Sequence, residues 1–238
     1  EAARRLTDLG ADPGLVEVTG NLKFDSLKAG PAPDERGVHR VLRYFQVPEG
    51  RPVVVAGSTM RGEETMVLQA YERLRTPERR PLLVIAPRHP ERFDEVERLA
   101  REEGLAVERR TRLDIDVEVR ADVVVLDTIG ELAHLYRIAW VVFVGGSLVP
   151  TGGHNILEPA VFGKPIVFGP YMHNFREIAD SFLAADAALQ VASPSELADV
   201  LEDLLDDEKR RARLGAAARG IIESSRGARD RTLAAIAA

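Results

Sequence analysis

The chain has 238 residues, of which 45% are hydrophobic, and its 32 Lys and Arg against 38 Asp and Glu give a formal net charge of −6. That balance argues against a general nucleic-acid binder, because no basic excess is present to neutralise phosphates. Cysteine is absent, which excludes disulfides and thiolate metal sites. No apolar run approaches the ~20 residues needed to span a bilayer, and no signal peptide is visible. We therefore expect this stretch of chain to be soluble.

The first fifty residues predict little regular structure. Residues 1–9 are typical of the end of a helix, closed by Gly10, and residues 15–19 predict a short strand. Residues 25–48 are rich in Pro, Gly and charge and are typical of a linker, with one helical piece around residues 37–45.

These patterns suggest a domain boundary. The chain starts with Glu1 inside a helical pattern, so we interpret it as a piece of a longer protein. On this interpretation residues 1–24 end a missing N-terminal domain, residues 25–50 form a linker, and residues 51–238 form a second domain with helices at its C-terminal end.

From residue 51 onward, short apolar runs alternate regularly with helical patterns. The expected strands are residues 52–56, 82–86, 105–108, 122–126, 140–144, 164–168 and 189–191. The expected helices are residues 62–75, 91–103, 129–138, a short helix opening at Asn155, and residues 175–184, 194–205, 208–224 and 229–237. Nearly continuous apolar strands that alternate with helices predict a Rossmann-like, doubly wound α/β domain with a parallel sheet. Its ligands should bind beyond the carboxyl ends of the strands.

The most informative stretch, residues 145–160, follows the buried strand predicted at residues 140–144 and carries two glycine pairs. A strand, a glycine loop and a helix N-terminus together favour an anion, so we expect a phosphate here, and a nucleotide as its source. The alternative is an ordinary turn, in which Asn155 caps the helix and Glu158 occupies its first turn. The polar cluster at a strand end favours the ligand; Gly146, Ser147, Gly153 and His154 are candidate contacts.

The loop Pro87-Arg88-His89-Pro90 follows the second expected strand. Two prolines stiffen the backbone around a guanidinium, which can donate two parallel hydrogen bonds to a phosphate. The alternative is a surface ion pair of Arg88 with Glu91, worth ~0–1 kcal/mol. We favour ligand contact, because a stiffened loop at a strand end is a poor place for a merely solvated charge.

Three further loops also follow strands. Ser58, in Gly57-Ser58-Thr59, either caps the next helix or touches a phosphate, and the residues alone favour the cap. Gly130 can admit the edge of a base, although residues 127–131 also fit an ordinary helix start, which the residues alone favour. His173-Asn174 can close the crevice. His134 lies inside a helical pattern and is expected to be packed or solvated, and the histidines show no metal-binding spacing.

Six segments match a known family in order and at compatible spacings: VTGNLKFD (18–25), AGST (56–59), PRHPERF (87–93), DTIGEL (127–132), FVGGSLV (143–149) and GGHNILEP (152–159). Together they resemble the 3-deoxy-D-manno-octulosonic acid (Kdo) transferases of lipopolysaccharide synthesis. The resemblance implies a GT-B glycosyltransferase, of which this chain is the C-terminal, donor-binding half. It also implies that the last helix crosses back to the N-terminal domain.

The resemblance further implies transfer of Kdo from CMP-Kdo to a lipid A precursor at the cytoplasmic face of the bacterial inner membrane. The general base, the acceptor site and the membrane association would lie in the missing N-terminal half. The residues that would hold CMP are Pro87, Arg88, Ile129, Gly130, Glu131, Asn155, Ile156, Leu157 and Glu158, with Ser58, His89, Gly146, Ser147, Gly153, His154 and Asn174 as further candidates. Neither a metal nor a cofactor is implied.

Our hypothesis for the roles is that Arg88 and the helix start at Asn155 face the phosphate. The turn at residues 129–131 would meet the cytosine, and Glu158 the ribose. This chain departs from the family pattern at Met60, where His is usual, and at Ile129, where Met is usual. Two alternatives remain: a GT-B relative that uses a UDP-sugar, as transferase or epimerase, and a non-catalytic nucleotide-binding domain.

Overall fold

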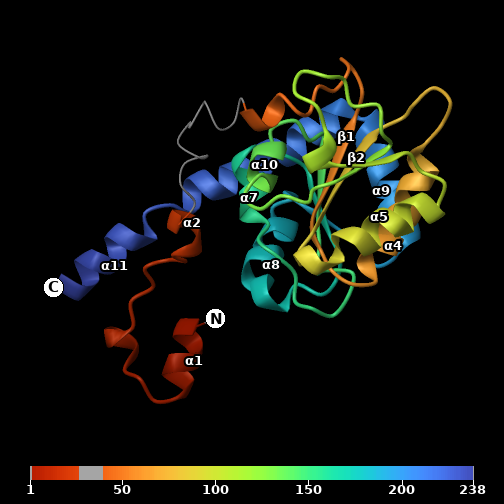
Figure 1. Cartoon of the computed structure of the whole chain (residues 1–238). Coiled ribbons are helices and arrows are strands. Elements are labelled where there is room, and N and C mark those ends of the chain that lie inside the picture. The colour runs from red at the N-terminus through yellow and green to blue at the C-terminus, as the bar shows by residue number, and fades with distance from the viewer. Residues whose placement is uncertain (1, 27–39, 238) are drawn as a thin grey trace.

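The computed structural model describes residues 2–26 and 40–237 and is organised around one parallel sheet (Figure 1). The sheet has seven strands in the order β3-β4-β2-β1-β5-β6-β7. Every pair of neighbouring strands is parallel. The strands are β1 Val53–Thr59, β2 Leu82–Pro87, β3 Val107–Arg109, β4 Val123–Val125, β5 Val141–Val144, β6 Ile166–Phe168 and β7 Leu189–Gln190. The predicted doubly wound sheet is therefore confirmed.

Helices cover both faces of this sheet, because the strand side chains alternate between two apolar cores. Val53 and Val55 of β1 enter one core, while Val54 and Ala56 enter the other. Helices α6 Leu132–Leu135, α7 Leu157–Val161, α8 Arg176–Ala184 and α10 Glu208–Ser225 contribute to the first core. Helices α4 Glu63–Leu74, α5 Phe93–Glu102 and α9 Pro194–Asp206 cover the second face. Short 3-10 helices lie at Pro90–Arg92 (η2), Arg110–Arg112 (η3) and His173–Phe175 (η4).

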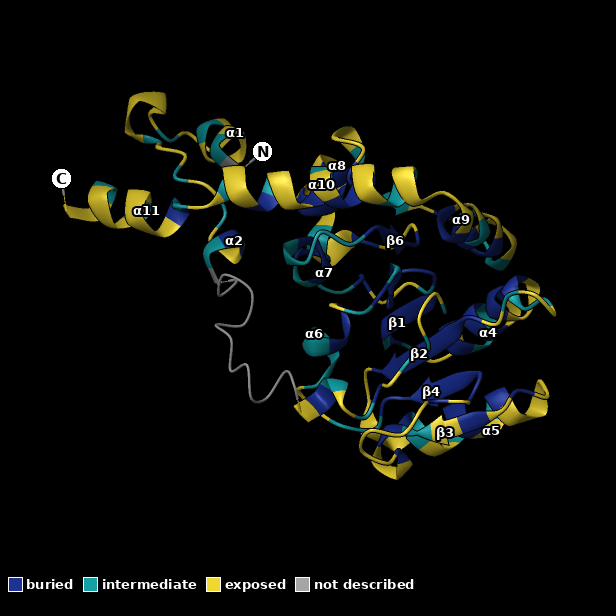
Figure 2. Ribbon diagram, turned by 90° about the horizontal axis from the view of Figure 1, so that it is seen from above, coloured by how far each residue is buried: buried dark blue, intermediate teal, exposed yellow. Residues whose placement is uncertain are grey.

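Both terminal segments lie to one side of the sheet and are largely exposed (Figure 2). They comprise α1 Ala2–Asp8, η1 Pro13–Leu15, α2 Lys23–Ser26 and α11 Ala228–Ala237. Asp25 ties them together by accepting hydrogen bonds from the amides of Gly227 (2.7 Å) and Arg229 (2.6 Å).

The strand predicted at residues 15–19 is wrong. Pro13–Leu15 form a 3-10 turn, which Asp12 caps by accepting a hydrogen bond from the Gly14 amide. Leu15 and Val18 are 85% and 75% exposed, so this apolar pattern has no core to face within the described residues.

The helical piece predicted at residues 37–45 lies partly outside the described residues. Of the part that is described, residues 40–42 are helical. Val41 and Phe45 are buried in the first core, so this stretch packs with the sheet.

The helix predicted at residues 129–138 is shorter than expected, since α6 covers only Leu132–Leu135. Gly130 has a φ of +87°, which a right-handed helix cannot contain. Within the described residues, no helix is both long and apolar enough to cross a membrane.

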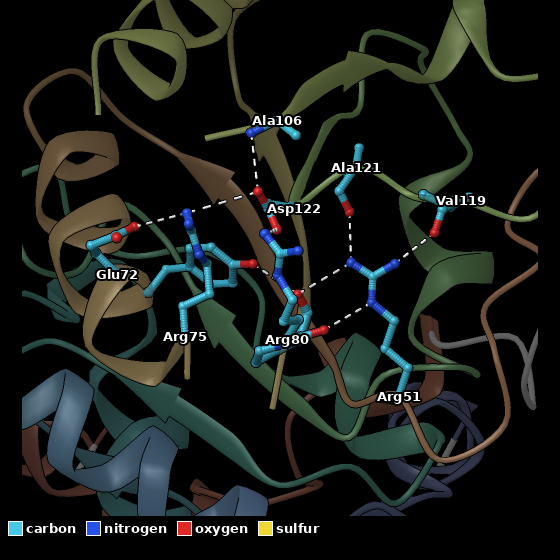
Figure 3. A network of polar contacts seen from close by, with 10 residues as sticks. Arg51, Glu72, Arg75, Arg80, Ala106, Val119, Ala121 and Asp122 are labelled. Atoms are coloured by element: carbon cyan, nitrogen blue, oxygen red, sulfur yellow. Dashed lines mark hydrogen bonds and ion pairs between the residues drawn. The ribbon is translucent and has the colours of Figure 1, made fainter. Parts of the chain in front are cut away.

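The amino-terminal edge of the sheet holds a polar network that satisfies itself (Figure 3). The Arg51 guanidinium donates to the carbonyls of Val119 and Ala121, both at 2.6 Å. Asp122 accepts from the Ala106 amide and lies 3.5 Å from the Arg80 guanidinium. A cavity of about 680 Å³ opens beside these groups. The charged side chains of Arg51, Arg80 and Asp122 that line it already have partners within the protein.

Candidate functional site

The carboxyl edge of the sheet brings the predicted loops together. Strand β1 lies between β2 and β5, so the direction of winding reverses beside it, which is where α/β sheets bind ligands. The Arg88 amide donates to the Thr59 carbonyl (2.9 Å), and the Gly145 amide donates to the Gly57 carbonyl (2.8 Å). The loops after β2 and β5 are thus both joined through their backbones to the end of β1.

Arg88 stands exposed on the loop after β2, directly behind the buried Pro87. Among the hydrogen bonds and ion pairs of the described residues, Arg88 takes part only through its backbone amide, and its guanidinium has no partner. The alternative pairing with Glu91 is therefore wrong; it is His89 whose Nδ1 lies 3.9 Å from the Glu91 carboxylate. An arginine held at this edge without a carboxylate is suited to an anionic ligand.

His154 links the loop after β5 to Arg88. The imidazole is half-buried, and burial lowers its pKa, with the positive charges of Arg88 and His89 acting in the same direction. His154 is therefore neutral near pH 7. The Arg88 guanidinium is thus within electrostatic range of the imidazole that follows the second glycine pair.

The amides at the first glycine pair are occupied by a carboxylate of the protein itself, which the glycine loop alone does not predict. The carboxylate of Glu63, at the start of α4, accepts hydrogen bonds from the amides of Gly146 (2.7 Å), Ser147 (3.0 Å) and Leu148 (2.8 Å). These amides form the anion-binding cradle that the glycine loop predicts, but the protein's own carboxylate fills it. These three amides are therefore not available to a bound phosphate.

Ser147, a further candidate contact, is fully buried. Its hydroxyl donates to the Val144 carbonyl (2.6 Å) and accepts from the Gly169 amide (2.8 Å). Both hydrogen-bonding functions of this hydroxyl are thus used to join the ends of β5 and β6, which leaves it buried away from the surface.

The segment that follows the second glycine pair keeps its backbone available. Helix α7 begins at Leu157 rather than at Asn155, because the Asn155 Oδ1 accepts from the Leu157 amide (3.1 Å) and turns the chain first. The side chains of Ile156 and Leu157 are buried in the first core. In the described part of the chain, the amides of Asn155 and Ile156 have no hydrogen-bond acceptor.

Glu158 lies beside this segment and is half-buried. Its Oε1 accepts a hydrogen bond from the Asn155 Nδ2 at 3.3 Å. Burial raises the pKa of the Glu158 carboxyl, and the hydrogen bond from Asn155 opposes this only in part. A carboxylate held in this way has acceptor capacity left for a sugar hydroxyl.

The turn after β4 is held in place by Arg110, which the sequence analysis did not single out. Arg110 donates to both oxygens of Glu131, at 2.7 and 2.9 Å, and its guanidinium lies 3.5 Å from the centre of the Tyr44 ring. The Thr128 hydroxyl also donates to Glu131 (2.8 Å). The Glu131 carboxylate is thus engaged, which leaves the backbone around Gly130 and the 87% exposed Ile129 to meet a ligand.

The remaining candidates lie elsewhere at the carboxyl edge of the sheet. Strand β1 extends to Thr59, so Gly57-Ser58-Thr59 completes the strand rather than forming a loop. Ser58 has a φ of +57°, at the point where the register with β2 shifts. The exposed Asn174 donates from its amide to the Gly152 carbonyl (3.0 Å) and from Nδ2 to the Thr151 carbonyl (3.2 Å). Residues 173–174 therefore support the second glycine pair from outside. Among the described residues, no group of three or more His, Asp or Glu is placed to hold a metal ion.

Comparison with known proteins identifies the family. Residues 30–221 match the family model of the glycosyl transferases group 1. The C-terminal CMP-Kdo binding domain of WaaA from Acinetobacter baumannii is 33% identical, with a TM-score of 0.72 over 79% of this chain and 97% of that one. The 3-deoxy-D-manno-octulosonic acid transferases of Bordetella pertussis and Haemophilus influenzae are 36% and 34% identical over 99% and 98% of this chain.

The matched model defines the class of protein as a group 1 glycosyltransferase, and the sheet is that of a GT-B donor half. Within that class, the chain belongs to the Kdo transferases and corresponds to their C-terminal half. It covers 54% and 53% of the two curated relatives, about half their length.

Proposed function

We propose that this chain is the donor-binding half of a Kdo transferase and that it binds the CMP part of CMP-Kdo. The observation that carries the proposal is the exposed Arg88 guanidinium, held at the sheet's switch point without a carboxylate partner in the described residues and close to His154. The solved relative from Acinetobacter, described as a CMP-Kdo binding domain, supports the same donor. The comparisons do not favour the UDP-sugar alternative.

In the proposed complex the donor phosphate lies between Arg88 and the amides of Asn155 and Ile156. The backbone of residues 129–131 meets the cytosine, and the Glu158 carboxylate accepts a hydrogen bond from the ribose. Fixed donors around the phosphate stabilise the charge that builds on the departing CMP. No metal is needed for that step, because the guanidinium and the amides already supply the positive charge.

The whole protein would then transfer Kdo to a lipid A precursor in lipopolysaccharide synthesis, at the cytoplasmic face of the bacterial inner membrane. We propose that residues 1–24 end the N-terminal domain, residues 25–50 form the linker, and residues 51–238 form the donor domain. The general base, the acceptor site and the membrane association belong to the N-terminal half. This chain alone should bind CMP without transferring Kdo.

The proposal is tested by titrating the chain with CMP and with UMP while recording amide resonances by NMR. We expect CMP to bind more tightly than UMP and to shift resonances of residues 129–131 and 152–156. A preference for UMP would favour a UDP-sugar enzyme. If neither nucleotide shifts these resonances, a non-catalytic domain that keeps the fold but only binds partners or regulates becomes the better account.

A further inference from the structure

Glu63 is the most heavily engaged carboxylate at the ligand edge, and the proposed function gives it no role. It is fully buried and accepts four backbone amides: those of Gly146, Ser147 and Leu148 in the loop after β5, and that of Met60 (3.1 Å) in the loop after β1. Burial raises the pKa of its carboxyl, and the four amide donors oppose that shift. One side chain therefore ties together the two loops that flank the switch point.

The two loops also pack closely against each other beside Glu63. A Cβ atom placed on Gly145 would come within 2.6 Å of the Ser58 carbonyl oxygen, 2.7 Å of the Thr59 Cα and 2.8 Å of a Glu63 carboxylate oxygen. Such distances are far inside van der Waals contact. The glycine at this position lets the loop backbone lie directly against β1 and the carboxylate.

One peptide group connects Glu63, through hydrogen bonds at its two ends, to the second glycine pair. The peptide between Gly146 and Ser147 donates its N–H to Glu63 (3.0 Å). Its carbonyl accepts hydrogen bonds from the Gly153 amide (2.7 Å) and the Thr151 hydroxyl (2.9 Å). A carboxylate on the N–H end polarises the peptide and strengthens the bonds at the carbonyl end. Gly153 directly precedes His154, which lies within electrostatic range of Arg88, and Asn155 follows.

We propose that Glu63 is a positioning residue of the donor site. Its carboxylate serves as an internal anion in the first glycine cradle, and through the Gly146–Ser147 peptide it orients the second glycine pair toward the donor phosphate. The ligand therefore meets a loop that is already ordered, so binding loses less conformational freedom. This inference rests on the proposed function and adds to it a residue that touches no ligand.

The test compares Glu63→Gln with Glu97→Gln, using calorimetric titration with CMP and thermal melts. Glutamine keeps the size of Glu63 but replaces one acceptor oxygen with an amide donor, which opposes the N–H groups that face it. Glu97 is a matched control, because it is also buried and accepts hydrogen bonds from Arg101, Arg109 and Arg112, on α5 and around β3.

We expect Glu63→Gln to bind CMP at least about tenfold more weakly, in the range for loss of a charged hydrogen bond. Glu97→Gln should stay within about twofold of the wild type even if its melting temperature falls. Glu63→Ala should regain CMP affinity when formate or acetate is added, relative to chloride at equal ionic strength. A role in stability alone predicts that both glutamine variants lose affinity only in proportion to their loss of folded protein, and that result would overturn the inference.

If Glu63→Gln does not fold, Thr151→Val decides the question. Thr151 is exposed, and this change removes only the hydroxyl that donates to the Gly146 carbonyl. We expect several-fold weaker CMP binding at unchanged stability, and unchanged affinity would overturn the inference. Failure of the wild-type chain to bind CMP rejects the proposed function together with the inference, whereas wild-type affinity in Glu63→Gln rejects the inference alone.

Discussion

Replacing Arg88 with alanine removes the one side-chain charge that the account assigns to the donor phosphate. A hydrogen bond to a charged group is worth about 1.5–3 kcal/mol, so CMP should bind about 10- to 150-fold more weakly. Stability should change by less than about 0.5 kcal/mol, because the guanidinium is exposed and has no hydrogen bond or ion pair to lose within the described residues. Arg88→Lys keeps the charge but loses the paired donors of the guanidinium, so its CMP affinity should lie between those of the wild type and Arg88→Ala.

Isothermal titration with CMP and with cytidine gives the sharpest form of this experiment. If Arg88 contacts the phosphate, Arg88→Ala weakens CMP and leaves the affinity for cytidine unchanged. Arg120→Ala is the matched control: it removes the same charge from an exposed side chain just before β4, at the opposite edge of the sheet. Equal CMP affinity in Arg88→Ala and the wild type, or an equal loss in Arg120→Ala, would refute the phosphate role.

Three further predictions concern stability, measured by urea unfolding. Burial raises the pKa of Glu158 in the folded state above its ordinary 4.5. As the pH rises, the carboxyl therefore ionises in the unfolded state before it does so in the folded state. The free energy of unfolding of the wild type falls as the pH rises from about 4.5 through the folded-state pKa. Glu158→Gln should remove that fall; a variant that loses more stability at pH 8 than at pH 4 would contradict it. Arg110→Ala should cost about 3 kcal/mol by leaving Glu131 unpaired, and adding Glu131→Ala should recover part of this; an additive loss would argue against the pairing. Gly145→Ala should cost about 1–3 kcal/mol through overpacking, whereas Gly220→Ala, with open space around it on α10, should gain about 0.5–1 kcal/mol; the reverse order would show the loop contact to be wrong.

The strands could be predicted because a strand that is buried on both faces needs apolar residues at nearly every position. Val53–Ala56 and Val141–Val144 are such runs. The same rule failed at residues 15–19, where Leu15 and Val18 stay exposed. A strand needs a neighbour, and the local pattern does not say whether one exists. The helix predicted at residues 129–138 begins only after Gly130 for a local reason, the positive φ of that glycine.

The site was predicted in part. The positions of the loops followed from the order of strands and helices, and Arg88 could be singled out from its prolines and its place at a strand end. Glu63 could not, because its amide partners lie 83–85 residues away in the chain. In the sequence it is only an acidic residue in the first turn of a helix. The Arg110–Glu131 pair was missed for the same reason, since its two members come from different loops.

The central claim is that the charge of a cytidylate lies between Arg88 and the backbone after the second glycine pair. A ¹H–¹⁵N NMR titration with CMP tests this most directly. The account predicts the largest shifts at the Arg88 Nε–H and at the amides of residues 152–156, with little change at residues 146–148, whose amides Glu63 already holds. Largest shifts at residues 146–148, or at the opposite edge around Arg51 and Asp122, would contradict it.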